Sequence, residues 1–134
     1  MIEKPMITRV SEEHHVIQVR QTAKALAEAI GFGQLDTYYI ATSVSELASN
    51  LFRHATRGGV ITFAVLRRDC VGIEVIAEDD GPGIPDVKLV MQDKFSSRGG
   101  MGRGLPGVER MMDEFEITST VGIGTRVLAR KWKT

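Results

Sequence analysis

Two glycine clusters in the second half of the chain carry the residues best suited to chemistry. Each alternates glycine with other residues: Gly81 and Gly83 after Asp79, then Gly100, Gly102 and Gly104. The first cluster follows an apolar run typical of a strand, and the second opens an apolar segment typical of a helix. Glycine lets backbone N–H groups approach an anion closely, and a helix N-terminus adds partial positive charge. The pattern predicts a nucleotide phosphate bound under a mobile loop.

A polar row in the first half of the chain is the second candidate. Glu46, Asn50 and His54 recur at every fourth residue within a segment of helical periodicity. This spacing puts a carboxylate, an amide and an imidazole on one face of a helix, beside the apolar stripe. Taken alone, such a row is typical of a polar helix flank. His54 lies closer to the apolar stripe than Glu46 does, which favours a packing role for it.

The composition limits the classes of function. Seventeen basic and seventeen acidic residues cancel among 134 residues, which argues against a nucleic-acid binder with a broad basic surface. Cys70 is the only cysteine, so no intramolecular disulfide is possible. No apolar run approaches the length of a membrane span. We therefore expect a single domain over residues 1–134 that is cytoplasmic and binds neither nucleic acid nor membrane.

The elements that must position these residues follow from periodicity. Strands are expected at 6–10, 60–66, 70–77, 115–120 and 125–132. Helices are expected from Ser11, as a cap, to a stop at Gly31, from Asp36, as a cap, to about 55, and at 86–91 and 105–113. A polar, glycine-rich lid is expected at about 92–104. This order predicts an α/β two-layer sandwich with helices on one face of a mixed sheet.

The adjacent pair His14 and His15 raises the question of a metal site or a phosphorylated histidine. Neighbouring residues on a helix point in different directions, so the two imidazoles are poorly arranged for one ligand. We expect both to be solvated surface histidines.

Three separated motifs together resemble one superfamily. Glu46-x-x-x-Asn50, Asp79-x-Gly81-x-Gly83 and the later glycine trio are similar, in this order, to the N, G1 and G2 boxes of the GHKL (Bergerat-fold) ATPases. Gly122-Ile123-Gly124-Thr125 resembles the late Gly-Thr element of that group. No GxxxxGK[ST] loop and no HRD/DFG set occurs, which excludes those phosphate-binding designs. The resemblance implies a Bergerat fold that binds ATP and Mg²⁺.

Within the superfamily, nearly the whole chain is similar to the small bacterial serine/threonine kinases of the RsbW, SpoIIAB and RsbT type. The segments GFGQLD, AEDDGPGIPD and GGMGRGLPGVERMMDEFEI resemble the RsbT-like switch kinases of stressosome modules. The glycine-led run ending in MMDEF, beside a very short lid, separates this branch from the others.

The resemblance also implies roles for individual residues. Asn50 is expected to supply its side-chain oxygen to Mg²⁺, for which a carboxamide oxygen is a suitable hard ligand. Glu46, one turn earlier, is expected to act as the general base on the attacking hydroxyl. Asp79 is expected to accept the adenine exocyclic amine, and Thr125 to support that contact.

The glycines and the lid are expected to surround the nucleotide. Gly81 and Gly83 would let the backbone pass beside the base and sugar, and Gly100, Gly102 and Gly104 would wrap the phosphates. Arg98, with Lys94 and Arg103, either offsets charge on the transferring phosphoryl group or remains a solvated loop charge.

The implied function is that of a protein serine/threonine kinase with two partners. It would phosphorylate STAS-domain antagonists similar to RsbS and RsbR, and after release bind and activate a PP2C-type phosphatase similar to RsbU. Phosphate added at an interface installs charge there, which is a physical means of ejecting a partner. The alternatives are an anti-sigma factor that binds a sigma factor directly, a nucleotide-dependent adaptor without transferase activity, and simple ATP hydrolysis.

Overall fold

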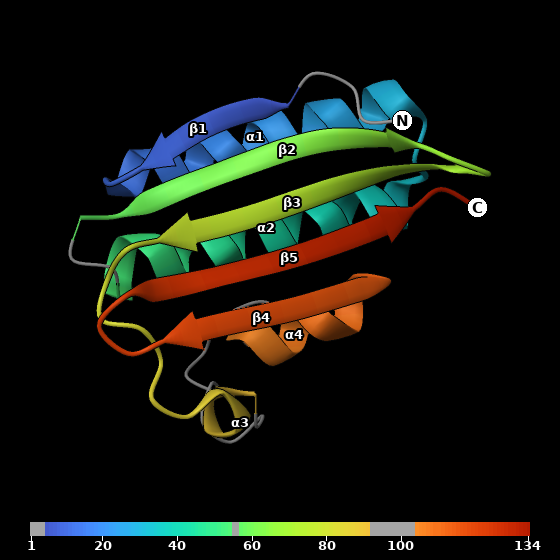
Figure 1. The fold of residues 1–134 in the computed structure, drawn as a ribbon. Helices are drawn as coiled ribbons and strands as arrows, with labels where there is room; N and C mark the ends of the chain where they lie inside the picture. Colours follow the sequence, from blue (N-terminus) through green and yellow to red (C-terminus); the bar gives the residue numbers. More distant parts are fainter. Residues whose placement is uncertain (1–4, 55–56, 92–103) are drawn as a thin grey trace.

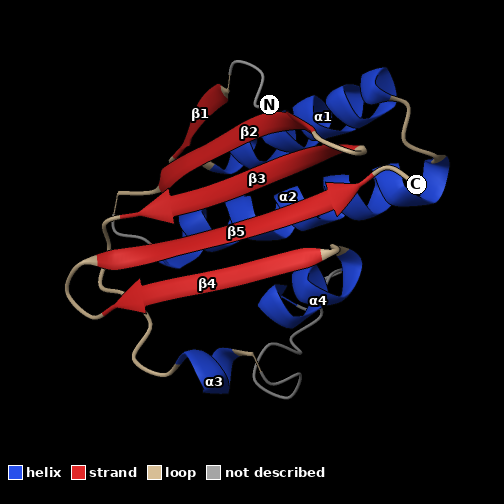
Figure 2. Ribbon diagram, turned by 45° about the vertical axis from the view of Figure 1, so that its right-hand side comes forward, coloured by secondary structure: helices blue, strands red, loops and turns tan. Residues whose placement is uncertain are grey.

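The computed structural model describes residues 5–54, 57–91 and 104–134 and places them in two layers, one sheet and one set of helices (Figures 1 and 2). The strands are β1 (Met6–Val10), β2 (Gly59–Arg67), β3 (Val71–Asp79), β4 (Glu114–Thr120) and β5 (Gly124–Trp132). The helices are α1 (Glu13–Ile30), α2 (Gln34–His54), α3 (Val87–Val90) and α4 (Gly104–Met111). The two-layer α/β architecture expected from the sequence is confirmed.

The sheet differs from the mixed sheet that we expected. Its order is β1-β2-β3-β5-β4, and each neighbouring pair is antiparallel. The connection from β3 to β4 does produce two parallel strands, but they are not neighbours. The hairpin after β4 returns the chain so that β5 inserts between β3 and β4. The strands β2 and β3 also form a hairpin, and β1 pairs with β2 as an antiparallel edge strand.

Helix α1 buries Val19, Ala23 and Ala27 and ends at Gly31, whose φ of 101° favours glycine. It begins one residue later than expected, with Glu12 rather than Ser11 at the N-cap. His15 is not merely solvated, because its Nδ1 accepts the backbone N–H groups of Ser11 and Glu12 at 3.0 and 3.1 Å. These bonds satisfy donors that lack an intrahelical acceptor, so His15 caps the helix.

Helix α2 begins before the expected cap. Its first residue is Gln34, and the Thr37 N–H donates to Gly33 O at 2.9 Å, which places Asp36 inside the first turn. An acid there still complements the helix dipole. Within the described part of the chain, every helix is too short or too polar to cross a membrane.

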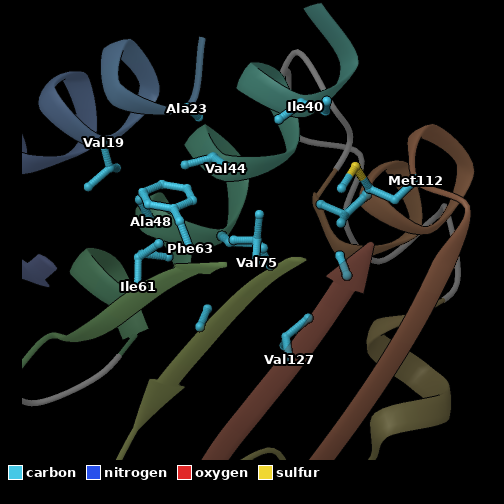
Figure 3. Close-up of a cluster of buried hydrophobic side chains, with 14 of the residues drawn as sticks. Val19, Ala23, Ile40, Val44, Ala48, Ile61, Phe63, Val75, Met112 and Val127 are labelled. Atoms are coloured by element: carbon cyan, nitrogen blue, oxygen red, sulfur yellow. The ribbon is translucent and has the colours of Figure 1, made fainter. Parts of the chain in front are cut away.

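The core lies between the helices and one face of the sheet (Figure 3). Val44 on α2 packs with Phe63, Val75 and Val127, which come from three adjacent strands, and Val108 of α4 is fully buried in the same cluster. Side chains of a strand alternate between faces. Because Ile73, Val75 and Ala77 of β3 face the helices, the next residue with the same orientation is Asp79.

Candidate functional site

The polar row of α2 lies where the sequence places it, at the border between core and solvent. Glu46 and Asn50 are half-buried on consecutive turns. Ser43 lies one turn before Glu46, and its buried Oγ has no hydrogen-bond partner among the described residues. A buried hydroxyl without a partner costs about 1–3 kcal/mol, so a ligand or water that paired with it would be favoured. His54 is the last residue of α2, and its side chain is outside the described part of the molecule.

A second row of polar side chains crosses the sheet at the ends of three strands. Asp79 of β3 is paired with Thr125 of β5, which is paired in turn with Ser119 of β4. Strand alternation directs all three toward the helix layer, since Val127 and Ala129 of β5 are buried there. The sheet therefore holds a carboxylate and two hydroxyls at one level.

Hydrogen bonds hold the loop after β3 against this row. Asp79 Oδ1 accepts the Gly81 N–H at 2.9 Å, which forms the turn that leaves the strand. Ser119 Oγ accepts the Ile84 N–H at 2.7 Å and lies 2.8 Å from Thr125 Oγ1. Sequence reasoning missed Ser119, because an isolated serine in an alternating strand carries no local sign of a partner thirty-five residues away.

Glycines allow this loop to approach the β4–β5 turn closely. Gly83 has φ of 80°, and a Cβ at this position would lie 2.5 Å from Thr120 O. A Cβ at Gly124, which has φ of 144°, would collide with Asp79 O. The Gly122 N–H donates to Pro82 O at 2.9 Å. We call the loop 79–84 and the turn 119–125 together the glycine end of the sheet.

Helix α2 reaches this end of the molecule, and α4 begins at a glycine. Gly59, at the start of β2, is so close to the Leu51 side chain of α2 that an added Cβ would lie 2.7 Å from it. Gly104, with φ of 67°, opens α4. In Figures 1 and 2, α3 lies beyond β4, the edge strand of the sheet, and α4 lies beside β4.

The structure thus brings together part of the predicted site. Asp79, Gly81, Gly83 and Thr125 are in one hydrogen-bonded group, while Glu46 and Asn50 are presented by α2 and Gly104 by α4. Arg98, Gly100, Gly102 and most of the predicted lid at 92–104 lie outside the described residues.

The opposite end of the sheet is built from charged groups, and we call it the ion-pair end. Arg130 donates from Nε to Glu74 at 2.7 Å and from Nη1 to Glu114 at 3.1 Å, and Trp132 Nε1 also donates to Glu114. The hydrogen bond from Trp132, aided by Arg130, lowers the pKa of Glu114. The hydrogen bond to Glu74 raises the pKa of Arg130. The carboxylate at the glycine end instead contacts a backbone N–H.

The polar groups of the glycine end, of α2 and of the start of α4 are together of the kinds that bind a purine nucleotide with a hard cation. Asp79 offers an acceptor to an exocyclic amine, and Thr125 offers a neighbouring hydroxyl. Asn50 offers an amide oxygen of the kind that Mg²⁺ accepts beside its waters. The N-terminus of α4 offers backbone N–H groups and partial positive charge to phosphates. The residues present therefore fit Mg²⁺ and ATP.

Comparison with known sequences gives a consistent result. Residues 10–131 match the model of the histidine kinase-like ATPase domain. The chain is 45% identical to the serine/threonine-protein kinase RsbT of Bacillus subtilis, over 92% of this chain and 93% of that protein. It is 39% identical to the anti-sigma F factor of Caldanaerobacter subterraneus subsp. tengcongensis, over 69% of this chain and 68% of that protein.

Solved structures share the fold. The RsbU and RsbW domains of Rv1364c from Mycobacterium tuberculosis superpose with a TM-score of 0.62 at 20% identity, over 98% of this chain and 33% of that longer chain. The mycobacterial sensor histidine kinase MprB gives a TM-score of 0.57 at 18% identity, over 97% of both chains. At these identities the likeness concerns the fold alone.

Proposed function

The chain belongs to the histidine kinase-like ATPase family, in the branch of the serine/threonine-protein kinase RsbT, and we propose that it is a switch kinase of the same kind. It transfers the γ-phosphate of ATP to a serine or threonine of a STAS-domain antagonist similar to RsbS or RsbR. After release it binds and activates a PP2C-type phosphatase similar to RsbU. The proposal treats residues 1–134 as one cytoplasmic kinase domain with a lid at about 92–104.

One observation carries the catalytic part of the proposal. Glu46 and Asn50 are half-buried on consecutive turns of α2, which runs toward the end of the sheet where Asp79 and Thr125 lie. A nucleotide whose adenine meets Asp79 would extend its phosphates toward α2 and the start of α4. A protein that only bound the nucleotide would have no need of a carboxylate beside the Mg²⁺ ligand.

Glu46 acts as the general base in this proposal. It accepts the proton of the acceptor hydroxyl while the hydroxyl oxygen forms a bond to the γ-phosphorus. The bond between that phosphorus and the β,γ-bridging oxygen breaks, and ADP leaves with the electron pair. Half-burial favours this role, because it keeps Glu46 within reach of solvent-delivered substrate while limiting competing water.

The remaining residues bind and orient the nucleotide. Asn50 would hold Mg²⁺, which neutralises phosphate charge when bound. Asp79 and Thr125 would hold adenine, and Gly81 and Gly83 would let the loop pass beside the base and sugar. Gly100, Gly102 and Gly104, with Arg98, would enclose the phosphates.

The test is a phosphotransfer assay with γ-labelled ATP, Mg²⁺ and the STAS-domain proteins encoded nearby in the same genome. Wild type, Glu46→Ala and the control Glu28→Ala, an exposed acid on α1, are compared at equal concentration. We expect label on a STAS serine or threonine, retained by the control and reduced by about 10²–10⁴-fold in Glu46→Ala. Calorimetry should show that Glu46→Ala still binds ATP.

Two outcomes would contradict the proposal. If ATP binds but no protein is labelled, the chain is a nucleotide-dependent adaptor. If free phosphate is released without labelled protein, the same base acts on water and the chain is a hydrolase.

The identity to an anti-sigma F factor supports a second candidate, direct binding of a sigma factor. It is the weaker one, because the RsbT match is both closer and longer. Affinity capture with the immobilised kinase separates the two: a PP2C-type phosphatase supports the first function and a sigma subunit the second.

A further inference from the structure

Lys131 is a nearly buried cation at the ion-pair end, on the face of β5 that meets the helices. It is 9% exposed. Its Nζ donates to Met111 O at 2.8 Å and lies 3.4 Å from Asp113 Oδ1 and 3.7 Å from Asp36 Oδ1. It also lies over the Tyr39 ring, 5.3 Å from the centroid. One ammonium group therefore contacts two separate parts of the chain, the start of α2 and the segment that ends α4.

These contacts join the two helices of the proposed ATP site at their far ends. Asp36 and Tyr39 belong to the first part of α2, whereas Met111 is the last residue of α4. The helices run in opposite directions (Figure 1), so the end of α2 and the start of α4 lie away from Lys131. At 1.5 Å per residue, Asn50 is about 16 Å along α2 from Tyr39, and Gly104 about 10 Å along α4 from Met111.

The face of α2 that contacts Lys131 is also the face that carries the site residues. Asp36, Tyr39, Ser43, Glu46 and Asn50 recur at spacings of three and four, which places them along one side of the helix. Fixing the start of this side relative to α4 therefore fixes how Glu46 and Asn50 face the N-terminus of α4.

A buried lysine at this position costs free energy of desolvation, so its presence suggests that the direction of its contacts matters. Removing a cation from water costs several kcal/mol, which its ion pairs largely offset, and a well-packed apolar side chain of similar volume is often as stable. What the ammonium group adds is direction, because Met111 O and two carboxylates fix its place. Its charge also complements the C-terminal dipole of α4.

We propose that Lys131 is a positioning residue for ATP. By tying the end of α4 to the start of α2, it sets the α4 N-terminus where its N–H groups meet the phosphates that Asn50 holds through Mg²⁺. The proposal rests on the ATP site proposed above and adds a residue of β5 that touches neither nucleotide nor substrate.

The test compares Lys131→Met with Lys133→Met, which changes an exposed lysine two residues later. Calorimetry measures the affinity of wild type and both variants for Mg·ATP and for adenosine, which has no phosphates. In Lys131→Met we expect the ATP affinity to fall by about three- to thirtyfold, the range for residues that act through packed elements. The adenosine affinity should remain within about twofold, and Lys133→Met should match wild type.

The ratio of the two affinities separates positioning from loss of structure. Equal losses for ATP and adenosine, or no loss for ATP, would overturn the proposal. If Lys131→Met does not fold, Asp36→Asn carries the test, because it removes the ion pair between Lys131 and α2 and its side chain is one-third exposed. A smaller shift of the same ratio then supports the proposal, and an unchanged ratio overturns it. If wild type binds no ATP, the proposed function fails first, and this inference with it.

Discussion

At the glycine end of the sheet, side chains hold the loop by accepting backbone N–H groups, whereas at the ion-pair end charged side chains pair with one another. The loop after Asp79 is fixed by two hydrogen bonds: the Gly81 N–H donates to the Asp79 carboxylate, and the Ile84 N–H donates to the Ser119 hydroxyl. Around Trp132, Arg130 bridges Glu74 and Glu114. Both ends terminate the same strands, β3 and β5.

The difference indicates how the chain separates binding from support. The charged groups at the ion-pair end are already paired with one another, so their role is to hold the strands in place. The glycine end uses small residues and short hydroxyl bridges, so that the loop and the turn pack closely beside the polar groups of Asp79 and Thr125. Lys131 links the ion-pair end to the proposed ATP site, because it joins one end of α2 to one end of α4 and the proposed site residues lie at the opposite ends of these helices.

The largest expected effect at the glycine end is that of Gly83→Ala. A side chain there is strained at φ of 80° and would approach Thr120 O to 2.5 Å. Strain of about 1–2 kcal/mol and crowding of about 1–3 kcal/mol should lower the free energy of unfolding by about 2–5 kcal/mol. Urea denaturation measures this change.

Gly122→Ala is the matched control. Its φ is 82°, but no atom lies within 4 Å of the added Cβ. Its free energy of unfolding should fall only by the backbone strain, about 1–2 kcal/mol. Equal losses in the two variants would show that the close approach of the loop and the turn does not matter.

Asp79→Asn should reduce ATP affinity by about ten- to a hundredfold, the loss of a charge-assisted hydrogen bond of about 1.5–3 kcal/mol. The amide oxygen can still accept the Gly81 N–H, so the turn is kept, but the new NH₂ can oppose the adenine amine. Asp80→Asn, at the exposed neighbouring residue, should bind ATP as wild type does. An affinity unchanged in Asp79→Asn would remove Asp79 from adenine recognition.

Ser119→Ala should lower the free energy of unfolding by about 1–2 kcal/mol, because the Ile84 N–H loses its acceptor. The exposed neighbour Thr118, on the opposite face of β4, provides the control Thr118→Ala. Thermal unfolding of both variants measures the effect. Matching stabilities would mean that the hydroxyl bridge at the glycine end is dispensable.

At the ion-pair end, the smallest effect is a pH dependence. The folded-state pKa of Glu114 is lowered by Trp132 and Arg130, so its stabilisation is present above the unfolded pKa and is lost as pH falls through the folded pKa. Because this side chain is 44% exposed, the contribution should stay below about 1 kcal/mol.

Denaturation at falling pH checks this sign. The advantage of wild type over Glu114→Gln should shrink as the pH falls below about 4.5, the range in which an unperturbed glutamate titrates. Glu116→Gln, at an exposed acid on the same face of β4, is the control. An advantage that grows on acidification would contradict the assigned cause.

The order of elements could be predicted because each has a strong local signal. Alternation predicts β2 and β3 within two residues of their observed ends. The short helix expected at 86–91 is observed as α3, and Asp86, which was expected inside it, is its N-cap and accepts the Leu89 N–H. The antiparallel sheet could not be predicted in the same way. It depends on β5 lying between β3 and β4, a long-range choice that local periodicity does not encode.

The site shows the same division. Asp79 and Thr125 are recognisable from their motifs, and the register of β3 with β5 places them together. Ser119 and Lys131 have no motif, since their partners lie far away in the sequence or on other elements. His15 was misjudged because a histidine side chain is an unusual acceptor at a helix start.

The most direct test of the central claim is to follow backbone amides by ¹H–¹⁵N NMR while Mg·ATP is added to the wild-type protein. We predict that the largest shifts occur at Asn50, Gly81, Gly83 and Thr125, with small shifts at Glu74 and Trp132. Largest shifts at the ion-pair end, or none anywhere at saturating Mg·ATP, would contradict the assignment of nucleotide binding to the glycine end of the sheet.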